Sequence, residues 1–249
     1  MLAACGWVNF GMIVLMCVFL AIDGREVAGV NPWLKPIKYA FALGLYAWTL
    51  SAILSLIEDF ETLRAVVAKI VAGLVLVQTF VVSIQAAGGV ESHFNITTAW
   101  DRWNFAILGV SSALNTVFAA MIFALVLTNL RSGIAPAIAW GARLGLALFI
   151  AAGFQGVQII LHQSHTVGGR DGGAGLPLLN WSTAHGDLRV AHVFGVLALP
   201  IIPLAGWAVS RFKWPPNVQR IAVAVIGIAY AALAWYANSV AMAGRPFLR

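Results

Sequence analysis

Charged residues are scarce in this sequence: Asp, Glu, Lys and Arg make up 10% of its 249 residues, whereas hydrophobic residues make up 61%. Soluble domains carry about 25% charged residues and about 45–50% apolar ones. A soluble fold would therefore expose more apolar surface to water than so few charges can offset. The composition excludes a soluble domain and predicts one transmembrane domain over residues 1–249.

Cysteine and the common catalytic motifs are rare or missing. The two cysteines, Cys5 and Cys17, form no Cys-x-x-Cys motif and lie in one apolar run, which excludes a disulfide framework and a cysteine zinc site. The sequence contains neither His-Glu-x-x-His nor Gly-x-Ser-x-Gly, so neither a zinc-protease helix nor a serine-hydrolase elbow is indicated. No internal repeat stands out, which disfavours an inverted-repeat transporter.

Basic clusters are missing as well. The N-terminus has no basic stretch before the apolar run Leu2–Ile22, which indicates a retained helix rather than a cleaved signal. The formal net charge is +6, but the basic residues are scattered singly between apolar runs. This pattern predicts no nucleic-acid partner and favours contact with lipid head groups.

Long apolar runs fill most of the chain. A spanning helix needs about 20 mostly apolar residues to cross about 30 Å of hydrocarbon. Seven segments meet this requirement, so the predicted fold is all-α, a bundle of seven transmembrane helices. They are Leu2–Ile22, Ile37–Ile57, Ala65–Ala87, Trp103–Leu130, Pro136–Leu161, Val190–Ser210 and Ile221–Ala243.

The connections define two sides of the bundle. Side A holds the N-terminus, and side B holds the C-terminus and the one long connection, a glycine-rich loop over residues 162–189. Loops of this length are usually functional or disordered, and this loop could form a flexible lid. The cations are almost equally divided between the sides, but the short, basic connections of side A favour a cytoplasmic N-terminus.

Imidazole and carboxylate groups gather on side B. Polar groups near hydrocarbon are costly and therefore tend to mark sites or pathways. All five histidines and most of the acids belong to this side: His93, His162, His165, His185 and His192, with Asp23, Glu26, Glu91, Asp101, Asp171 and Asp187. This asymmetry predicts a functional site near one membrane face.

Helical spacing places several polar residues on common faces. The spacing predicts one face carrying Gln155, Gln158, His162 and His165, a second carrying Asp101, Asn104, Leu108, Ser111 and Asn115, and a third carrying Gln78 and Gln85. Together with Asp187, Arg189 and His192 at the start of the sixth helix, these faces predict a polar cavity open to side B and closing near mid-membrane.

One hypothesis for this site is a metal or a haem. Imidazole is a common ligand for zinc, copper and iron. Spacing places His162 and His165 where they could share a metal, with His93 or His185 as a further ligand. Alternatively, His162 and His192 could be axial ligands of a haem b, with Gln155 and Gln158 lining the cofactor site. Interfacial hydrogen bonding is the simpler interpretation of each single histidine.

Neighbouring acids and arginines are candidate catalytic groups. Asp101 precedes Arg102, and Asp187 and Arg189 are two residues apart. Either pair could act as a proton relay or an anchor for an anionic group, although structural ion pairing is the simpler interpretation. In Lys35-Pro36-Ile37-Lys38, the lysines are expected to meet lipid phosphates or, less simply, an acidic substrate.

Four stretches resemble a family of uncharacterised bacterial polytopic membrane proteins: residues 35–40 (Lys-Pro-Ile-Lys-Tyr-Ala), 85–95, 165–168 (His-Thr-Val-Gly) and 186–192 (Gly-Asp-Leu-Arg-Val-Ala-His). Relatives of this family carry a further histidine where this sequence has Val196, so a ligand pair on the sixth helix is in doubt. The resemblance covers most of the chain and implies a bacterial inner-membrane location, with no established activity.

Three function classes follow from these patterns. The first is a membrane-embedded protein that binds a metal or haem near side B for redox or hydrolytic chemistry. The second is a transporter or channel for a small polar solute, lined by Gln85, Asn104, Asn115, Gln155 and Gln158. The third is an accessory subunit of a larger membrane complex. A lipid bilayer and a small-molecule ligand are the expected partners.

Overall fold

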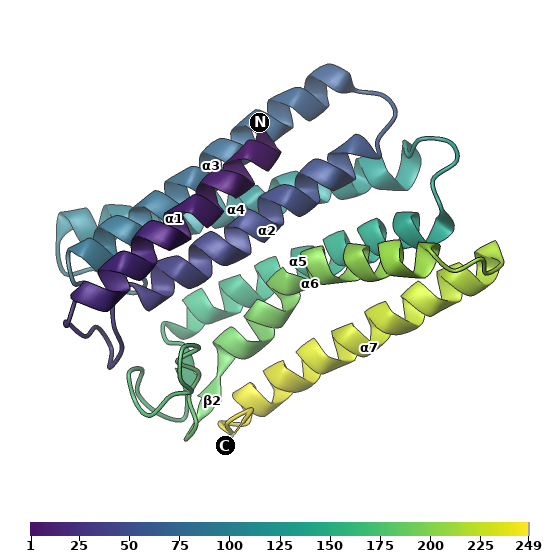
Figure 1. Cartoon of the computed structure of the whole chain (residues 1–249). Helices are drawn as coiled ribbons and strands as arrows, with labels where there is room; N and C mark the ends of the chain where they lie inside the picture. The colour runs from purple at the N-terminus through teal and green to yellow at the C-terminus, as the bar shows by residue number, and fades with distance from the viewer. Residues whose placement is uncertain (249) are drawn as a thin grey trace.

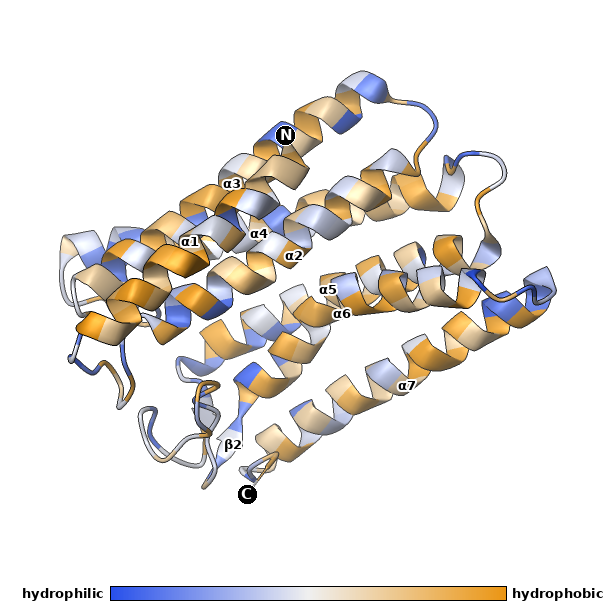
Figure 2. Ribbon diagram, viewed as in Figure 1, coloured by the Kyte–Doolittle hydropathy of each residue, from blue (hydrophilic) through white to orange (hydrophobic). Residues whose placement is uncertain are grey.

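The computed structural model describes residues 1–248 and confirms seven helices long and apolar enough to cross a membrane. They are α1 (Leu2–Ile22), α2 (Leu34–Ser55), α3 (Glu61–Ala87), α4 (Ala99–Thr128), α5 (Pro136–His162), α6 (Leu188–Ser210) and α7 (Pro216–Met242). The strands β1 (Thr166–Val167) and β2 (Gly186–Asp187) pair antiparallel within the α5–α6 connection. The chain is an integral membrane protein. Figure 2 shows hydrophobic residues along the helices and hydrophilic residues mainly towards the helix ends and connections.

Most helices begin earlier than their apolar runs. Helix α4 starts at Ala99 rather than Trp103 because Thr98 and Asp101 form a capping box, in which each side chain accepts a hydrogen bond from the other residue's backbone. Helix α2 starts at Leu34, with Pro36 in its first turn. Hydropathy detects only the part of a helix that lies in hydrocarbon. The apolar runs therefore do not include the polar first turns of these helices.

The helices form two groups that pack side by side (Figure 1). Helices α1 to α4 make one group and α5 to α7 the other, and the groups meet through α4 against α5 and α2 against α6. Helices α5 and α6 pack most extensively. A Cβ atom at Gly145 of α5 would lie 2.7 Å from the Pro203 ring of α6, so glycine permits this close approach.

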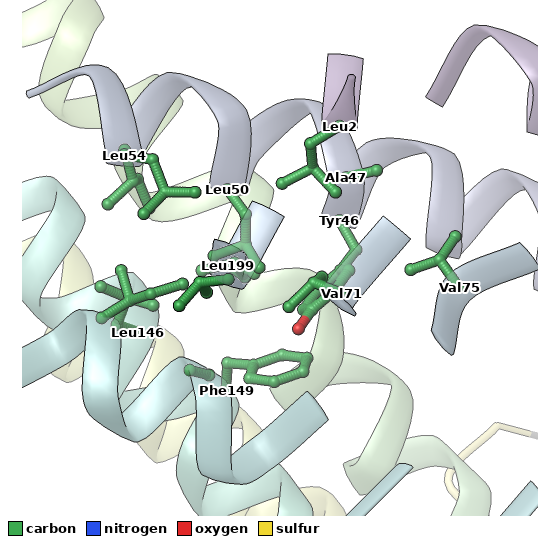
Figure 3. Packing of buried hydrophobic residues seen from close by; sticks show 14 of the residues in the cluster. Leu2, Tyr46, Ala47, Leu50, Leu54, Val71, Val75, Leu146, Phe149 and Leu199 are labelled. Carbon is green, nitrogen blue, oxygen red and sulfur yellow. The ribbon is translucent and has the colours of Figure 1, made fainter. Parts of the chain in front are cut away.

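The half of the bundle nearer side A is packed with apolar side chains. Its cluster is fully buried and draws on six helices, as Figure 3 shows for part of the set. It includes Leu50, Ile53, Val67, Val71, Ile122, Leu146, Phe149 and Leu199. Most buried polar residues lie closer to side B, with Asn9 and Gln219 as exceptions in the side-A half, so the two halves of the bundle differ in chemical character.

Candidate functional site

The loop between α5 and α6 on side B is ordered by internal hydrogen bonds. The Asp171 carboxylate accepts four of them: from the backbone N–H groups of His165 (3.0 Å) and Thr166 (2.8 Å), the Ser164 hydroxyl (2.9 Å) and His165 Nδ1 (2.8 Å). Partial burial would raise the pKa of Asp171, but these hydrogen bonds outweigh burial and hold it well below its ordinary value. Asp171 is therefore an anchor for the loop.

Asp187 anchors the other end of the same loop. It is the N-cap of α6, and its side chain is fully buried. Its carboxylate accepts from the Ser182 amide at 2.8 Å and pairs with the Arg189 guanidinium at 2.6 Å. Arg189 also donates to the Asn180 carbonyl at 2.5 Å. Both carboxylate oxygens of Asp187 already accept hydrogen bonds. The pair of Asp187 and Arg189 is therefore a structural ion pair, the simpler of the two interpretations of these residues.

The structure does not pair Asp101 with Arg102. Asp101 is occupied by its capping box and by the Thr97 hydroxyl, whereas the Arg102 guanidinium donates to the Ile96 carbonyl. Consecutive residues on a helix do not face one another, so adjacency in sequence is a poor guide to pairing. Asp101 therefore caps α4 at the side-B surface.

His93 lies at the centre of a polar cluster that joins α2 to the α3–α4 and α5–α6 loops. Its Nδ1 is 3.2 Å from Lys35 Nζ and 3.0 Å from the Ser92 hydroxyl, and its Nε2 is 3.1 Å from the Tyr39 hydroxyl. When Lys35 is an ammonium group, which can only donate, Nδ1 accepts and Nε2 carries the proton. His93 is thereby held as a neutral imidazole.

His165 is the other histidine of this cluster. Its ring centroid lies 6.1 Å from that of His93, and Phe94 packs against both rings. Burial lowers the pKa of His165 against the opposing effect of its hydrogen bond to Asp171. In the neutral ring Nδ1 donates to Asp171, so Nε2 is left as an acceptor.

The His93 cluster makes stability depend on pH. Burial lowers the pKa of His93 well below its ordinary value of 6.5, helped by the Lys35 ammonium and by His165 and His192. Because the His93 imidazole binds a proton more readily in the unfolded chain than in the folded one, its contribution to stability is fully present above about pH 6.5 and is lost as the pH drops below that value.

We expect the thermal unfolding midpoint of the purified protein to fall between pH 7 and pH 5, and His93→Gln to reduce that fall. His162→Gln removes an exposed imidazole outside the cluster and is the matched control. Equal pH dependence of the wild-type protein and His93→Gln would contradict this prediction.

The structure separates the two histidines predicted to bind a haem. His162 is the last residue of α5, and its Nε2 contacts the Thr166 carbonyl at 3.2 Å. The His192 ring donates from Nδ1 to the Ala152 carbonyl at 2.9 Å, in the bundle interior. Ala152 precedes His162 by ten residues, which is about 15 Å along a helix. A shared axial pair is not formed.

The helix face predicted to carry Gln155, Gln158, His162 and His165 is wrong at its C-terminal end. Helix α5 stops at His162 because Gln163 adopts a left-handed conformation, so His165 belongs to the loop. The other two members diverge as well: Gln155 lies beside Gly195 of α6, and Gln158 donates to Met242 of α7. These residues do not line one common site.

The proposed metal ligands are likewise not assembled. Within residues 1–248 no three His, Cys, Asp or Glu side chains are grouped so that they could hold a metal ion. Both nitrogens of His93 already have partners, one of them a lysine, and His185 packs against Gly169. This geometry gives the metal hypothesis no support.

A polar cavity of about 410 Å³ opens within the α5–α6 loop. It is lined by Thr166, Arg170, Asp171, Gly172, Gly173, Ala174, Asn180, Ser182, Ala184, His185 and Arg189. Its one carboxylate, Asp171, is already saturated by hydrogen bonds, whereas its wall carries two guanidinium groups, one imidazole and several hydroxyl and amide donors. Among the lining side chains, donors therefore outnumber free carboxylates, a composition suited to an anion even though Arg189 is already paired with Asp187.

Sequence reasoning missed Tyr39, Arg170 and the hydroxyl of Ser182. Tyr39 could have been found because it lies four residues after Lys35 and therefore on the same helix face. Arg170 and Ser182 lie in irregular structure, for which periodicity gives no signal.

Comparisons of this chain with protein-family models, with curated proteins and with solved structures return no match. The bacterial membrane family suggested by the sequence stays a prediction. Interpretation of the site therefore depends on its own geometry.

Proposed function

We propose that this membrane protein binds a small anionic solute, a carboxylate or a phosphate, in the side-B loop cavity. The observation that carries the proposal is the cavity wall, where Arg170 has no carboxylate within salt-bridge distance among the described residues and His185 lies in the same wall. Arg189 also lines the cavity, although its guanidinium is already paired with Asp187. Guanidinium groups hydrogen-bond carboxylate and phosphate in a matching planar geometry.

Electrostatics around the cavity favours the same ligand. Lys35 and Lys38 at the start of α2 both lie close enough to Arg189 to be repelled by it. The attraction of Lys35 to Glu91 and Asp171, and of Lys38 to Asp187, is weaker for each carboxylate than this repulsion. Lys38 donates to the Leu179 carbonyl and Lys35 contacts His93, so neither ammonium has a carboxylate within salt-bridge distance among the described residues. A bound anion would relieve this repulsion.

Removing the Arg170 charge tests the proposal. In calorimetry, we expect inorganic phosphate or acetate to bind the purified wild-type protein saturably. We expect Arg170→Gln to weaken this binding about 10-fold or more, because one charge-assisted hydrogen bond is lost. Arg102→Gln, an exposed arginine of side B outside the cavity, should bind as the wild-type protein does.

Two further measurements sharpen this test. Competition by anionic lipid in nanodiscs, absent with zwitterionic lipid, would assign the site to a head group rather than a free solute. A Soret band, or metal in a fixed ratio to protein, would instead favour the haem or metal hypothesis. Failure of both anions to bind, or equal binding by Arg170→Gln, contradicts the proposal.

We also propose that side A faces the cytoplasm of a bacterial inner membrane, so that the cavity opens away from it. The support is the short side-A connections, which carry Arg131, Arg211 and Lys213. A cysteine introduced at Ile96, which is 62% exposed in a side-B loop, should react with an impermeant thiol reagent added outside intact cells.

A further inference from the structure

A column of amide and hydroxyl side chains runs between α3 and α4 inside the bundle. Each member is at most 4% exposed, so neither lipid nor bulk water reaches it across the outer surface. The members are Gln78 and Gln85 on α3, and Asn104, Ser111 and Asn115 on α4. Asn115 lies near the middle of its helix, so the column extends to about mid-membrane.

Four atoms of this column have no hydrogen-bond partner within the described chain: Gln78 Nε2, Gln85 Oε1, Asn104 Nδ2 and Asn115 Oδ1. A buried polar atom without a partner costs more free energy in a membrane than in a soluble protein, because no solvent is at hand to satisfy it. Two of the four are donors and two are acceptors. Water supplies both functions and normally occupies such positions.

The column begins at the His93 cluster. The Gln85 amide reaches the Glu91 carbonyl at 3.5 Å in the α3–α4 loop, two residues before His93. Tyr39, whose hydroxyl contacts His93, packs against the cluster of Val81 and Val82 on α3 and Leu108 on α4. The polar path thus starts at the side-B surface.

The column ends at an aromatic pair. The Tyr46 hydroxyl reaches the Asn115 carbonyl at 3.4 Å, and its ring lies 5.0 Å from that of Phe149. Below this pair the side chains are apolar, and Figure 3 shows Tyr46 and Phe149 together with Leu50, Leu146 and Leu199 of the buried cluster. No polar group of the column continues past this point towards side A.

We propose that this column is a water-filled half-channel, which admits water and small neutral hydrogen-bonding solutes from side B and is closed at mid-membrane by Tyr46 and Phe149. It is distinct from the anion cavity, because it is lined by amides and hydroxyls rather than by guanidinium groups. The half-channel brings water to the centre of an otherwise dry bundle and leaves the side-A half closed.

Cysteine accessibility tests this proposal. In a background with Cys5→Ala and Cys17→Ala, single Asn104→Cys, Ser111→Cys and Asn115→Cys variants are reconstituted in sealed vesicles. They are treated from each side with a charged methanethiosulfonate, which reacts with thiolate in water and not with a thiol in hydrocarbon. Ser111→Cys is nearly isosteric, so it keeps the test valid if an asparagine variant does not fold.

Matched controls lie on the same helix at similar depth. Ile107 and Leu114 face outwards, with 37% and 39% of their surface exposed to lipid, and Ala119 is fully buried in the apolar half. We expect the column cysteines to react from side B only, at least about 10-fold faster than Ile107→Cys, Leu114→Cys and Ala119→Cys. This expectation follows from the partition of the charged reagent into water.

Two results would overturn the half-channel. Column cysteines that react no faster than the lipid-facing controls would show a dry interior, and equal reaction from both sides would show a path open through the membrane. Neither result bears on phosphate binding by the loop cavity, which Arg170→Gln tests separately.

Discussion

Asp187→Asn should lower the stability of the protein by about 2–4 kcal/mol. Removing one partner of a buried ion pair costs about 3–5 kcal/mol, and the lower end applies because the Arg189 side chain is 29% exposed. The substitution leaves Arg189 without its carboxylate partner, but the asparagine side chain can still cap α6. It should also weaken anion binding, because the same carboxylate holds Ser182 and Arg189 in the cavity wall.

The chain contains its own control for this experiment. Asp23 and Arg25 form the same Asp-x-Arg arrangement at the end of α1, with Oδ1 accepting from the arginine backbone and Nε, but Arg25 is 51% exposed. Solvent screening makes such pairs weak. Unfolding in detergent should therefore show a much smaller loss for Asp23→Asn, and equal losses would contradict the role assigned to burial.

Gly206→Ala should be destabilising by about 1–3 kcal/mol or more, the cost of overpacking a well-packed interior. A Cβ atom at Gly206 of α6 would clash with the Ala137 carbonyl oxygen of α5. Because that neighbour is backbone, the two helices must move apart. These are the most extensively packed helices of the bundle, and they carry both ends of the cavity loop.

Gly109→Ala on α4 is the matched control, because a Cβ atom there meets nothing within 4 Å. Alanine is favoured over glycine in a helix by about 0.5–1 kcal/mol, so this variant should be unchanged or slightly more stable. Unfolding midpoints of the two variants in the same detergent give the comparison. A Gly206→Ala protein as stable as Gly109→Ala would show that α5 and α6 adjust freely.

The sequence predicted which side of the bundle carries the site but not its composition. His93 and His165 were both assigned to side B, and they do meet. Their partners Lys35 and Asp171 come from α2 and from the loop after α5, and no single-helix pattern relates these segments. His162 and His165 were predicted to share a face, but one left-handed residue, Gln163, turns the chain between them.

The seven helices and the polar end of the bundle were determined by the sequence alone. Hydrocarbon accepts only long apolar segments whose backbone groups are satisfied internally, and each crossing reverses the direction of the chain. The contacts that make a site were decided by the tertiary structure. The helical repeat gives the face on which a residue lies but not the rotation of that face towards a neighbouring helix. The path of the 25-residue connection between α5 and α6 depends on hydrogen bonds, such as those of Asp171 and Asp187, that form only once the helices have packed.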